Sequence, residues 1–454
     1  MIDRRQFLQT LMAAAASPGL AGAASPTGRQ GLVPDPNELL ELPEGFSYRI
    51  VSRAGDTMSD GLKVPPAHDG MAAFPGADGR VILVCNHEMP PSYPEYSAFG
   101  TDFRELPDST RERVYDHGGG TSPGVGGTTT TVFDPETGRT IRQHLSLAGT
   151  ELNCAGGPTP WGSWLSCEEC FEQPGTDFSG GRLVTRDEPH GYVFEVPATE
   201  DGLVDPVPIK AMGRFEHEAC AVHAPSGIVY MTEDRHYSLF YRYIPDLPGK
   251  LHEGGKLQAL GIAGRPSMQT HNWSGDADIE IGRSYPVTWI DLSDINSDEN
   301  DLRLRGAKAG AATFARGEGL CSAAGAFAFT CTIGGPRRLG QVFSYVPSPA
   351  EGQAGETSEP GQLMLVAASS PDSLLHNGDN LTMAPWGDLV ICEDTGGQCG
   401  IVGLRSDGSQ YMLANNAYSD SELAGVCFSP DGKTMFVNIQ YPGTTVAITG
   451  PWPG

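Results

Sequence analysis

The chain has 454 residues, 59 glycines, 36 prolines and a formal net charge of −26, with only 30 lysines and arginines. This negative charge argues against nucleic acid and anionic membrane surfaces as partners. Because turn-forming residues are frequent and charged helical runs are scarce, we expect an all-β protein built of many short strands.

The N-terminus predicts an export signal. Asp3-Arg4-Arg5 precedes a modest apolar run through Ala16, and the small residues Ala21-Gly22-Ala23 follow. A twin arginine, an apolar core and a small-residue cleavage site are typical of substrates of the Tat translocation machinery. We therefore expect residues 1–25 to be a Tat signal peptide and the mature protein to be periplasmic or secreted. No later stretch has about 18 consecutive apolar residues, so we expect no stable membrane insertion.

Six diverged copies of one hairpin recur along the chain when it is aligned on a central turn glycine. Each copy combines a short strand, a turn rich in Pro, Gly or Asp, and a second apolar strand. The copies span residues 69–88, 154–169, 218–233, 318–332, 379–393 and 425–438. With the strand-like runs between them, they predict a single β-propeller domain over residues 26–454. We expect six blades, or seven if residues 250–315 hide a degenerate one.

Acidic side chains recur at the two ends of these copies. The residues that open a copy are Asp69, Cys154, Glu218, Glu318 and Asp379, and those that close one are Glu88, Glu168, Glu233 and Glu393, with Glu169 directly after Glu168. Equivalent positions of propeller blades converge at one end of the axis, where a ring of acids repels itself unless cations bind. A thiolate with carboxylates suits a transition metal alongside harder cations. The pattern therefore predicts a multinuclear metal site.

The stretch from Asp291 to Asp301 is acidic, and residues 302–316 follow it with a helix-prone composition. We expect this segment to be an insertion that carries a short helix and could form a lid beside the site. His87 and His236 adjoin the predicted ligands, and we expect them to support the site rather than bind metal.

Several segments together resemble one known family. They are Asn153-Cys-Ala-Gly-Gly-Pro-Thr-Pro-Trp-Gly-Ser-Trp-Leu-Ser-Cys-Glu-Glu169, Arg214-Phe-Glu-His-Glu-Ala219, Tyr230-Met-Thr-Glu-Asp-Arg235, Phe314-Ala-Arg-Gly-Glu-Gly319 and Gly378-Asp-Asn380. As a set they resemble the PhoX family of Tat-exported alkaline phosphatases. The resemblance covers most of the mature chain and implies a β-propeller that holds ferric iron and calcium ions and hydrolyses phosphomonoesters.

The resemblance also implies residue roles. Cys154 would bind iron, and Glu168, Glu169, Glu233 and Glu318 would bind metal. Arg316 would hold phosphate oxygens. The chemistry of arginine, whose fork suits bidentate contact, makes Arg235 a second candidate for this role. For Arg235 an ion pair with Asp234 or Glu233 is an equally good interpretation.

Two other functions fit the same fold. A calcium-dependent lactonase-type hydrolase would use a similar carboxylate geometry, and a propeller that keeps metals only for stability would be a binding module. The lactonase-type hydrolase has no need of Cys154 or Arg316. We therefore expect an alkaline phosphatase acting on a small phosphomonoester, with Ca²⁺ and Fe³⁺ as cofactors.

Overall fold

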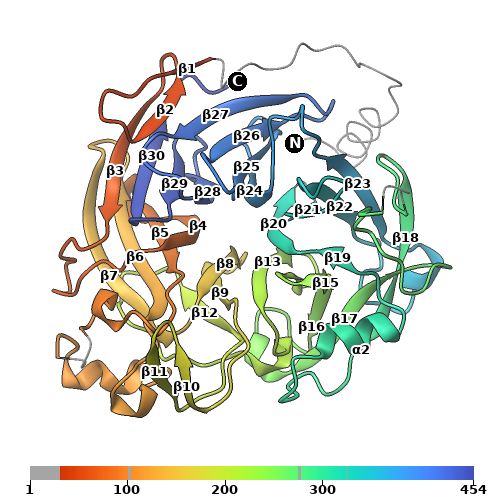
Figure 1. Cartoon of the computed structure of the whole chain (residues 1–454), viewed down its shortest axis with the longest axis horizontal. Helices are drawn as coiled ribbons and strands as arrows, with labels where there is room; N and C mark the ends of the chain where they lie inside the picture. Colours follow the sequence, from red (N-terminus) through yellow and green to blue (C-terminus); the bar gives the residue numbers. More distant parts are fainter. Residues whose placement is uncertain (1–30, 101–103, 275–277, 324, 454) are drawn as a thin grey trace. The chain divides into compact units, whose positions relative to one another are not determined.

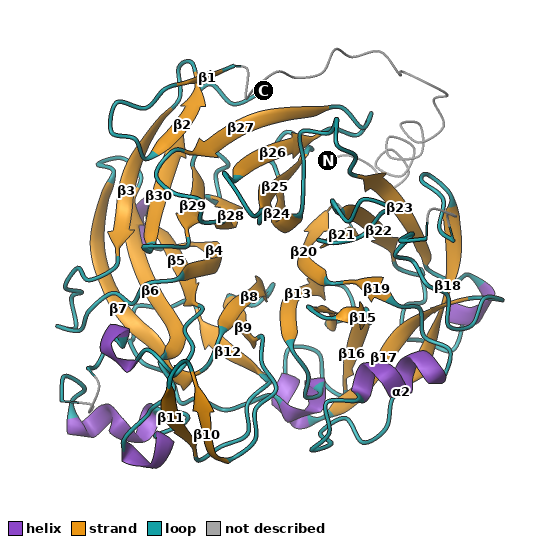
Figure 2. Cartoon of the chain, viewed as in Figure 1, coloured by secondary structure: helices purple, strands orange, loops and turns teal. Residues whose placement is uncertain are grey.

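A computed structural model of the chain describes residues 31–100, 104–274, 278–323 and 325–453. The expected signal peptide over residues 1–25 lies outside these residues. Strands make up most of the regular structure, and the described residues contain a single α-helix, α2 (Leu302–Lys308), so the all-β prediction is confirmed (Figure 2). Within the described chain, no helix combines the length and the apolar character needed to cross a membrane.

The described residues form two compact units. Unit 1 comprises residues 31–44 and 219–422, and unit 2 comprises residues 45–218 and 423–453. The expectation of one domain over residues 26–454 stays a prediction. Each unit is considered below by itself.

Unit 2 consists of antiparallel sheets. One four-stranded sheet has the order β28 (Leu423–Phe428), β29 (Met435–Ile439), β30 (Thr444–Thr449), β3 (Ser47–Arg53). The other has the order β4 (His68–Pro75), β5 (Val81–His87), β6 (Gly126–Asp134), β7 (Arg139–Thr150). A three-stranded sheet has the order β12 (Val193–Pro197), β9 (Ser163–Glu168), β8 (Asn153–Pro158). A two-stranded hairpin pairs β10 (Gly175–Ser179) with β11 (Arg182–Arg186). Figure 1 shows β3 beside β30, so an early strand completes the sheet formed by the last three.

Unit 1 has two large sheets and one small one. The six-stranded sheet has the order β1 (Leu32–Val33), β2 (Leu40–Pro43), β27 (Gln410–Asn416), β26 (Gly400–Leu404), β25 (Leu389–Glu393), β24 (Gly378–Met383). The nine-stranded sheet has the order β13 (His217–His223), β14 (Ile228–Glu233), β16 (Tyr241–Pro245), β17 (Gly255–Ile262), β18 (Ser284–Asp291), β23 (Gln362–Ala368), β22 (Gln341–Val346), β21 (Ala326–Cys331), β20 (Gly317–Ala323), and belongs to unit 1 from Ala219 on. β15 (His236–Ser238) pairs with β19 (Phe314–Ala315).

Short 3-10 helices occupy residues 77–79, 94–96, 108–113, 118–120, 210–212, 251–253 and 356–358.

The sheets are propeller-like, but the prediction of six blades is corrected. Among the described residues, four sheets have at least four strands. One reason is that β18 pairs with β17 on one side and with β23 on the other, which joins two four-strand meanders into one sheet. The other is that the sheet of β8, β9 and β12 has only three strands. The sequence repeat marks hairpins, and it carries no information about which outer strands pair.

The six predicted hairpins correspond to β4–β5, β8–β9, β13–β14, β20–β21, β24–β25 and β28–β29. In five of these ladders the register shifts near the start of the first strand, so that two residues bulge opposite one. The bulged pairs are Asp69-Gly70, Cys154-Ala155, Glu318-Gly319, Asp379-Asn380 and Gly425-Val426. Because a bulge turns a side chain out of the regular alternation, it gives the opening residues a common orientation that differs from that of their strands.

The bulges allow neighbouring hairpins to approach closely. A Cβ added to Gly70 would lie 2.5 Å from the Cα atom of Ala155, and one added to Gly319 would lie 2.6 Å from the carbonyl oxygen of Asp379. Only glycine tolerates such an approach without a backbone shift. One bulge therefore packs directly on the next within each unit.

Polar side chains satisfy the buried bulge carbonyls. Asn86 Nδ2 donates to the carbonyl oxygens of Cys154 (3.1 Å) and Ala155 (2.7 Å), while Thr330 Oγ1 donates to that of Asp379 (2.7 Å). Thr232 and Asn438 make corresponding bonds to Glu318 and Asp69. Since a buried carbonyl without a donor is costly, these side chains fix the spacing of successive bulges.

The predicted helical insertion is confirmed as α2. Gly306 of this helix lies against Leu239, since an added Cβ would be 2.5 Å from Leu239 Cδ1. Arg305 in the same helix donates to the carbonyl oxygens of Ser293 and Asp294, which holds the acidic stretch in place. A role as a lid stays a prediction.

We expect Asn86→Ala to lower the free energy of unfolding by roughly 2–4 kcal/mol, because it removes two donors from buried carbonyls and an acceptor from Trp164 Nε1 and Ser166 Oγ. Urea unfolding followed by fluorescence measures the change. The exposed Asn296→Ala is the control and should shift the midpoint little. A near-neutral Asn86→Ala would show that the bulges hold their spacing without this side chain.

Candidate metal centre and phosphate site

A thiol and two carboxylates meet in unit 2. Cys154, Glu169 and Glu218 each offer a ligand atom, and these atoms lie within 4.8 Å of one another. Cys154 is the first bulged residue of β8, Glu169 directly follows β9, and Glu218 is the second residue of β13. Three separate strands therefore deliver one donor each.

A strained residue joins the two ends of the β8–β9 hairpin. Leu152 has a φ of 45°, which non-glycine residues rarely adopt, and its carbonyl oxygen accepts the N–H of Glu169 at 2.9 Å. The bond sets Glu169 beside the bulge that carries Cys154. Backbone strain of this kind is found mainly where surrounding structure enforces a functional geometry.

Cys154 is buried beside negatively charged side chains. The residue is only 4% exposed, and burial together with the charges of Glu218 and Glu169 raises the pKa of its thiol well above the ordinary value. A thiolate would therefore be unfavourable here without a cation, and a bound metal ion reverses this balance by stabilising the thiolate. The donor set, one sulfur and two carboxylates, fits a transition metal ion.

The structure separates the adjacent pair Glu168 and Glu169. Glu168 is fully buried, and its carboxylate accepts N–H groups of Glu151 (3.0 Å), Gly191 (2.9 Å) and Tyr192 (3.2 Å). These bonds tie the β9 end to the loop that precedes β12. Glu168 thus braces its own sheet, whereas Glu169 points to Cys154.

Glu168 is also part of a buried ion network. His190 donates through Nδ1 to Glu168 at 2.6 Å and through Nε2 to Asp116 at 3.0 Å. Burial alone would lower the pKa of His190, but the charges of Glu168, Asp116 and Glu151 outweigh it and raise that pKa to about 10. The ring is therefore an imidazolium that donates at both nitrogens.

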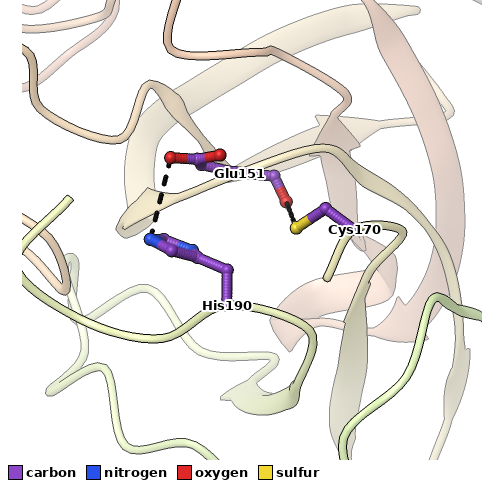
Figure 3. A group of neighbouring side chains, drawn as sticks. All are labelled: Glu151, Cys170 and His190. Atoms are coloured by element: carbon purple, nitrogen blue, oxygen red, sulfur yellow. Dashed lines mark hydrogen bonds and ion pairs between the residues drawn. The ribbon is translucent and has the colours of Figure 1, made fainter. Parts of the chain in front are cut away.

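Glu151, Cys170 and His190 in this network have residue types that could bind zinc (Figure 3). Their contacts indicate a different role. Arg186 binds the Glu151 carboxylate through Nε (2.8 Å) and Nη2 (2.9 Å), and His190 Nε2 lies 3.7 Å from Glu151. Two cations of the chain already balance these acids, so the group is an ion-pair network that supports the β8–β9 hairpin.

Asp69 and Glu88 form a second acidic pair in unit 2. Gln440 Nε2 donates to Asp69 Oδ2 at 3.0 Å and to Glu88 Oε2 at 2.7 Å, so both carboxylates face one amide. His87, the residue before Glu88, bonds instead to the Pro66 carbonyl and Thr129 Oγ1, which supports its expected structural role.

The closing acids do not all occupy the same position relative to their strand pairs; we call this position the phase of the residue. His68 pairs with His87 and Asn153 with Glu168, so Glu88 is equivalent to Glu169 rather than to Glu168. Glu393, which pairs with Gly378, has the phase of Glu168. Its oxygens accept N–H groups of His376 (2.8 Å) and Gly400 (2.9 Å) in its own sheet.

Glu233 at the end of β14 is fully buried in unit 1. Its Oε2 atom accepts the Tyr241 hydroxyl at 2.8 Å and the N–H of Leu239 at 3.2 Å. Asp234 follows it, as Glu169 follows Glu168, and is the residue that meets Arg316.

Arg316 is the centre of a charged group in unit 1. Its Nε donates to Asp234 Oδ1 at 2.6 Å, Nη2 donates to Asp234 Oδ2, and Nη2 also lies 3.3 Å from Glu318 Oε1. The side chain remains 32% exposed. A guanidinium held along one edge by a buried carboxylate presents its other edge in a fixed orientation, which suits bidentate binding of an anion.

The backbone of Arg316 is itself in a strained conformation, with φ at 57°. Its N–H donates to the Arg235 carbonyl (3.2 Å), and its carbonyl accepts the N–H of Thr332 (3.0 Å). Phe314, two residues earlier, packs edge-to-face against the stacked rings of Phe329 and Phe343 at ring-centre distances of 5.4 and 5.5 Å. A rigid aromatic core therefore imposes the position of Arg316.

Asp379 adds a carboxylate from the neighbouring bulge of unit 1. Burial, followed by the charge of Asp394, raises its pKa above the ordinary value. Asn380 Nδ2 donates to its Oδ1 atom at 3.0 Å. Such a carboxylate ionises readily only when a cation is near.

Arg235 lies on the exposed loop between β14 and β15. The carboxylate of Asp234, one of the two partners predicted for Arg235, binds Arg316. Sequence reasoning did not select Asp234 or Asp394 as site residues. Both directly follow the second strand of a hairpin, as Glu88 and Glu169 do, so a comparison of that position across the hairpins would have identified them.

The family described as alkaline phosphatase PhoX matches residues 27–443. No curated protein matches the sequence significantly. Among solved structures, Pseudomonas fluorescens PhoX in complex with vanadate, a transition state analogue, is similar with a TM-score of 0.65 and 19% identity over 91% of this chain and 96% of that chain. A gluconolactonase from Xanthomonas campestris reaches a TM-score of 0.38 and 11% identity over 89% of this chain and 98% of that chain.

The His190 network predicts a pH-dependent stability. Since the folded pKa of about 10 exceeds the unfolded value near 6.5, the imidazolium stabilises the fold fully below about pH 6.5, and this contribution is lost as pH rises towards 10. We expect His190→Gln to cost most stability at pH 6.5 and progressively less up to pH 10, as measured by urea unfolding at each pH. A cost that is independent of pH would show that His190 is neutral in the folded protein.

Proposed function

The chain belongs to the alkaline phosphatase PhoX family, which makes it a phosphomonoesterase, and on that premise we propose which residues perform the reaction. Cys154, Glu169 and Glu218 hold ferric iron, and Glu318 and Asp379 hold calcium. Arg316, steadied by Asp234, binds phosphate oxygens. The observation that carries this proposal is the buried thiol with two carboxylates within 4.8 Å. Neither a lactonase-type hydrolase nor a metal-stabilised binding module accounts for it together with the family match.

Glu88 and Asp69 are further candidates for calcium, because they share the phase of Glu169 and Cys154 in their hairpin. The hydrogen bonds of Glu168 and Glu393 within their own sheets favour a bracing role, and Glu233 has similar bonds on one oxygen. We therefore assign the metal ions to Asp69, Cys154, Glu318 and Asp379 at the bulges, to Glu88 and Glu169 after the second strands, and to Glu218.

The chemistry of the reaction explains why these residue types are needed. A phosphate dianion and an acidic site repel each other, which opposes binding and attack. When bound, ferric iron and calcium supply Lewis acidity that offsets this charge. Arg316 contributes a fixed positive charge that needs no proton transfer, and its ion pair with Asp234 removes the entropy cost of orienting the guanidinium during the reaction.

Arg235 is a second candidate for phosphate binding, because its carbonyl oxygen accepts the N–H of Arg316 and its side chain is exposed. For the chain as a whole, the family match and the twin arginine Arg4-Arg5 support export by the Tat route to the periplasm or beyond.

We expect Cys154→Ser to lose bound iron and to reduce turnover of p-nitrophenyl phosphate by more than about tenfold, because a hydroxyl is a poor substitute for a thiolate ligand. Elemental analysis and a rate assay measure the two effects. Cys427→Ser is the matched control, since Cys427 is also buried in unit 2 but belongs to an apolar cluster. Retention of iron and activity by Cys154→Ser would exclude the assignment.

Arg316→Lys should lower kcat/KM by about 100-fold, which is the scale of losing one preorganised donor to an oxyanion. Lysine keeps the charge but loses the planar fork that Asp234 orients. The surface ion pair of Arg283 with Glu280 provides the control, and Arg283→Lys should leave kcat/KM unchanged. Equal activities of Arg316→Lys and wild type would assign phosphate binding to another residue.

A further inference from the structure

An aromatic cluster lies next to Arg316 in unit 1. The Trp273 ring stacks on His271 with ring centres 4.3 Å apart, and Tyr237 meets both rings edge-on at 5.3 and 5.0 Å. His236 lies 5.8 Å from Trp273, and the guanidinium of Arg338 lies 4.8 Å from the centre of the same indole. Tyr237 is 45% exposed, and His236 and Arg338 are exposed as well.

The cluster is built on the same backbone as Arg316. His236 pairs with Ala315, the residue before Arg316, in the β15–β19 ladder. On the other side, Ile333 N–H donates to the Ala315 carbonyl at 3.4 Å, and the Ile333 carbonyl accepts the Trp273 Nε1–H at 2.6 Å. His236 therefore pairs directly with the residue before Arg316, and Trp273 is linked to that residue by two hydrogen bonds through Ile333.

The cluster shows signs of a surface kept for binding. Tyr237 has a φ of 59° and Arg338 a φ of 56°, conformations that cost free energy for non-glycine residues. His271 below them is buried, and its Nε2 bonds to Thr313 Oγ1 at 3.0 Å, so the rings rest on a fixed base. Burying these rings would stabilise the fold, yet the chain holds Tyr237 at the surface.

We propose that Tyr237, Trp273, His236 and Arg338 form a platform that binds the planar, aromatic leaving group of a phosphomonoester whose phosphate is held by Arg316. The proposal rests on the proposed function and adds a substrate class to it. A planar π-system stacks on aromatic side chains, and a guanidinium over an indole adds a further flat cationic face. An aliphatic alcohol as leaving group gains little from such a surface.

The test compares kcat/KM of Tyr237→Ala with that of wild type for 1-naphthyl phosphate, adenosine 5′-monophosphate and glycerol phosphate, because the ratio for each substrate cancels its intrinsic reactivity. We expect a loss of about 2- to 10-fold for 1-naphthyl phosphate, for the nucleotide or for both, on the scale of one aromatic pair, and none for glycerol phosphate. Alanine is chosen because it keeps the positive-φ backbone as strained as tyrosine does.

Two further variants make the result specific. Tyr237→Phe retains the ring and should restore the wild-type values. Tyr418→Ala removes a tyrosine that is 56% exposed elsewhere in unit 1 and should change nothing. The proposal would be overturned if Tyr237→Ala lost the same factor for all three substrates, or if it lost nothing for both 1-naphthyl phosphate and the nucleotide. Wild-type turnover of glycerol phosphate and its dependence on Cys154 test the proposed function alone, so a failure of one proposal is distinguishable from a failure of the other.

Discussion

The close approach of successive bulges is the constraint on which the site depends. Four of the five bulges place a potential ligand first, and the absent Cβ of Gly70 or Gly319 in second place lets the next hairpin approach to backbone contact. A Cβ at either position would lie only 2.5 or 2.6 Å from that backbone, so any larger residue would push the strands apart. The distances between ligand side chains are therefore set by the glycine beside them as much as by the ligands themselves.

The buried acids fall into two groups with different electrostatic surroundings. In the His190 network, the imidazolium and Arg186 balance Asp116, Glu151 and Glu168 within unit 2. Around Cys154 the carboxylates instead raise the pKa of a buried thiol, which an apo protein would tolerate only with the thiol protonated. The first arrangement is suited to stability and the second to binding a cation. Adjacent residues, Glu168 and Glu169, belong to different groups because a strand directs successive side chains to opposite faces.

The sequence was sufficient to locate all six hairpins and the residues that open them, because a repeat with a fixed turn is visible in one dimension. It was insufficient for the closing acids, since a shift of one residue reverses the face, and Glu88 aligned with Glu168 instead of Glu169. The predicted number of blades was wrong because β18 pairs with β23, a strand more than 70 residues further along the chain, and a local repeat cannot show such pairing. His190, Asp116 and Trp273 come from loops without any periodic pattern, so only the fold brings them to their partners.

Arg316 shows how the rigid and the exposed parts of unit 1 are related. Phe314 packs against the stacked rings of Phe329 and Phe343, Asp234 binds the guanidinium of Arg316, and the backbone of Arg316 is held at a positive φ. The free energy that this conformation costs is supplied by the aromatic core, and the orientation that results is available before any ligand arrives. A side chain that is oriented in advance loses little entropy on binding, which is the condition under which one arginine can contribute substantially to recognition of a phosphate group.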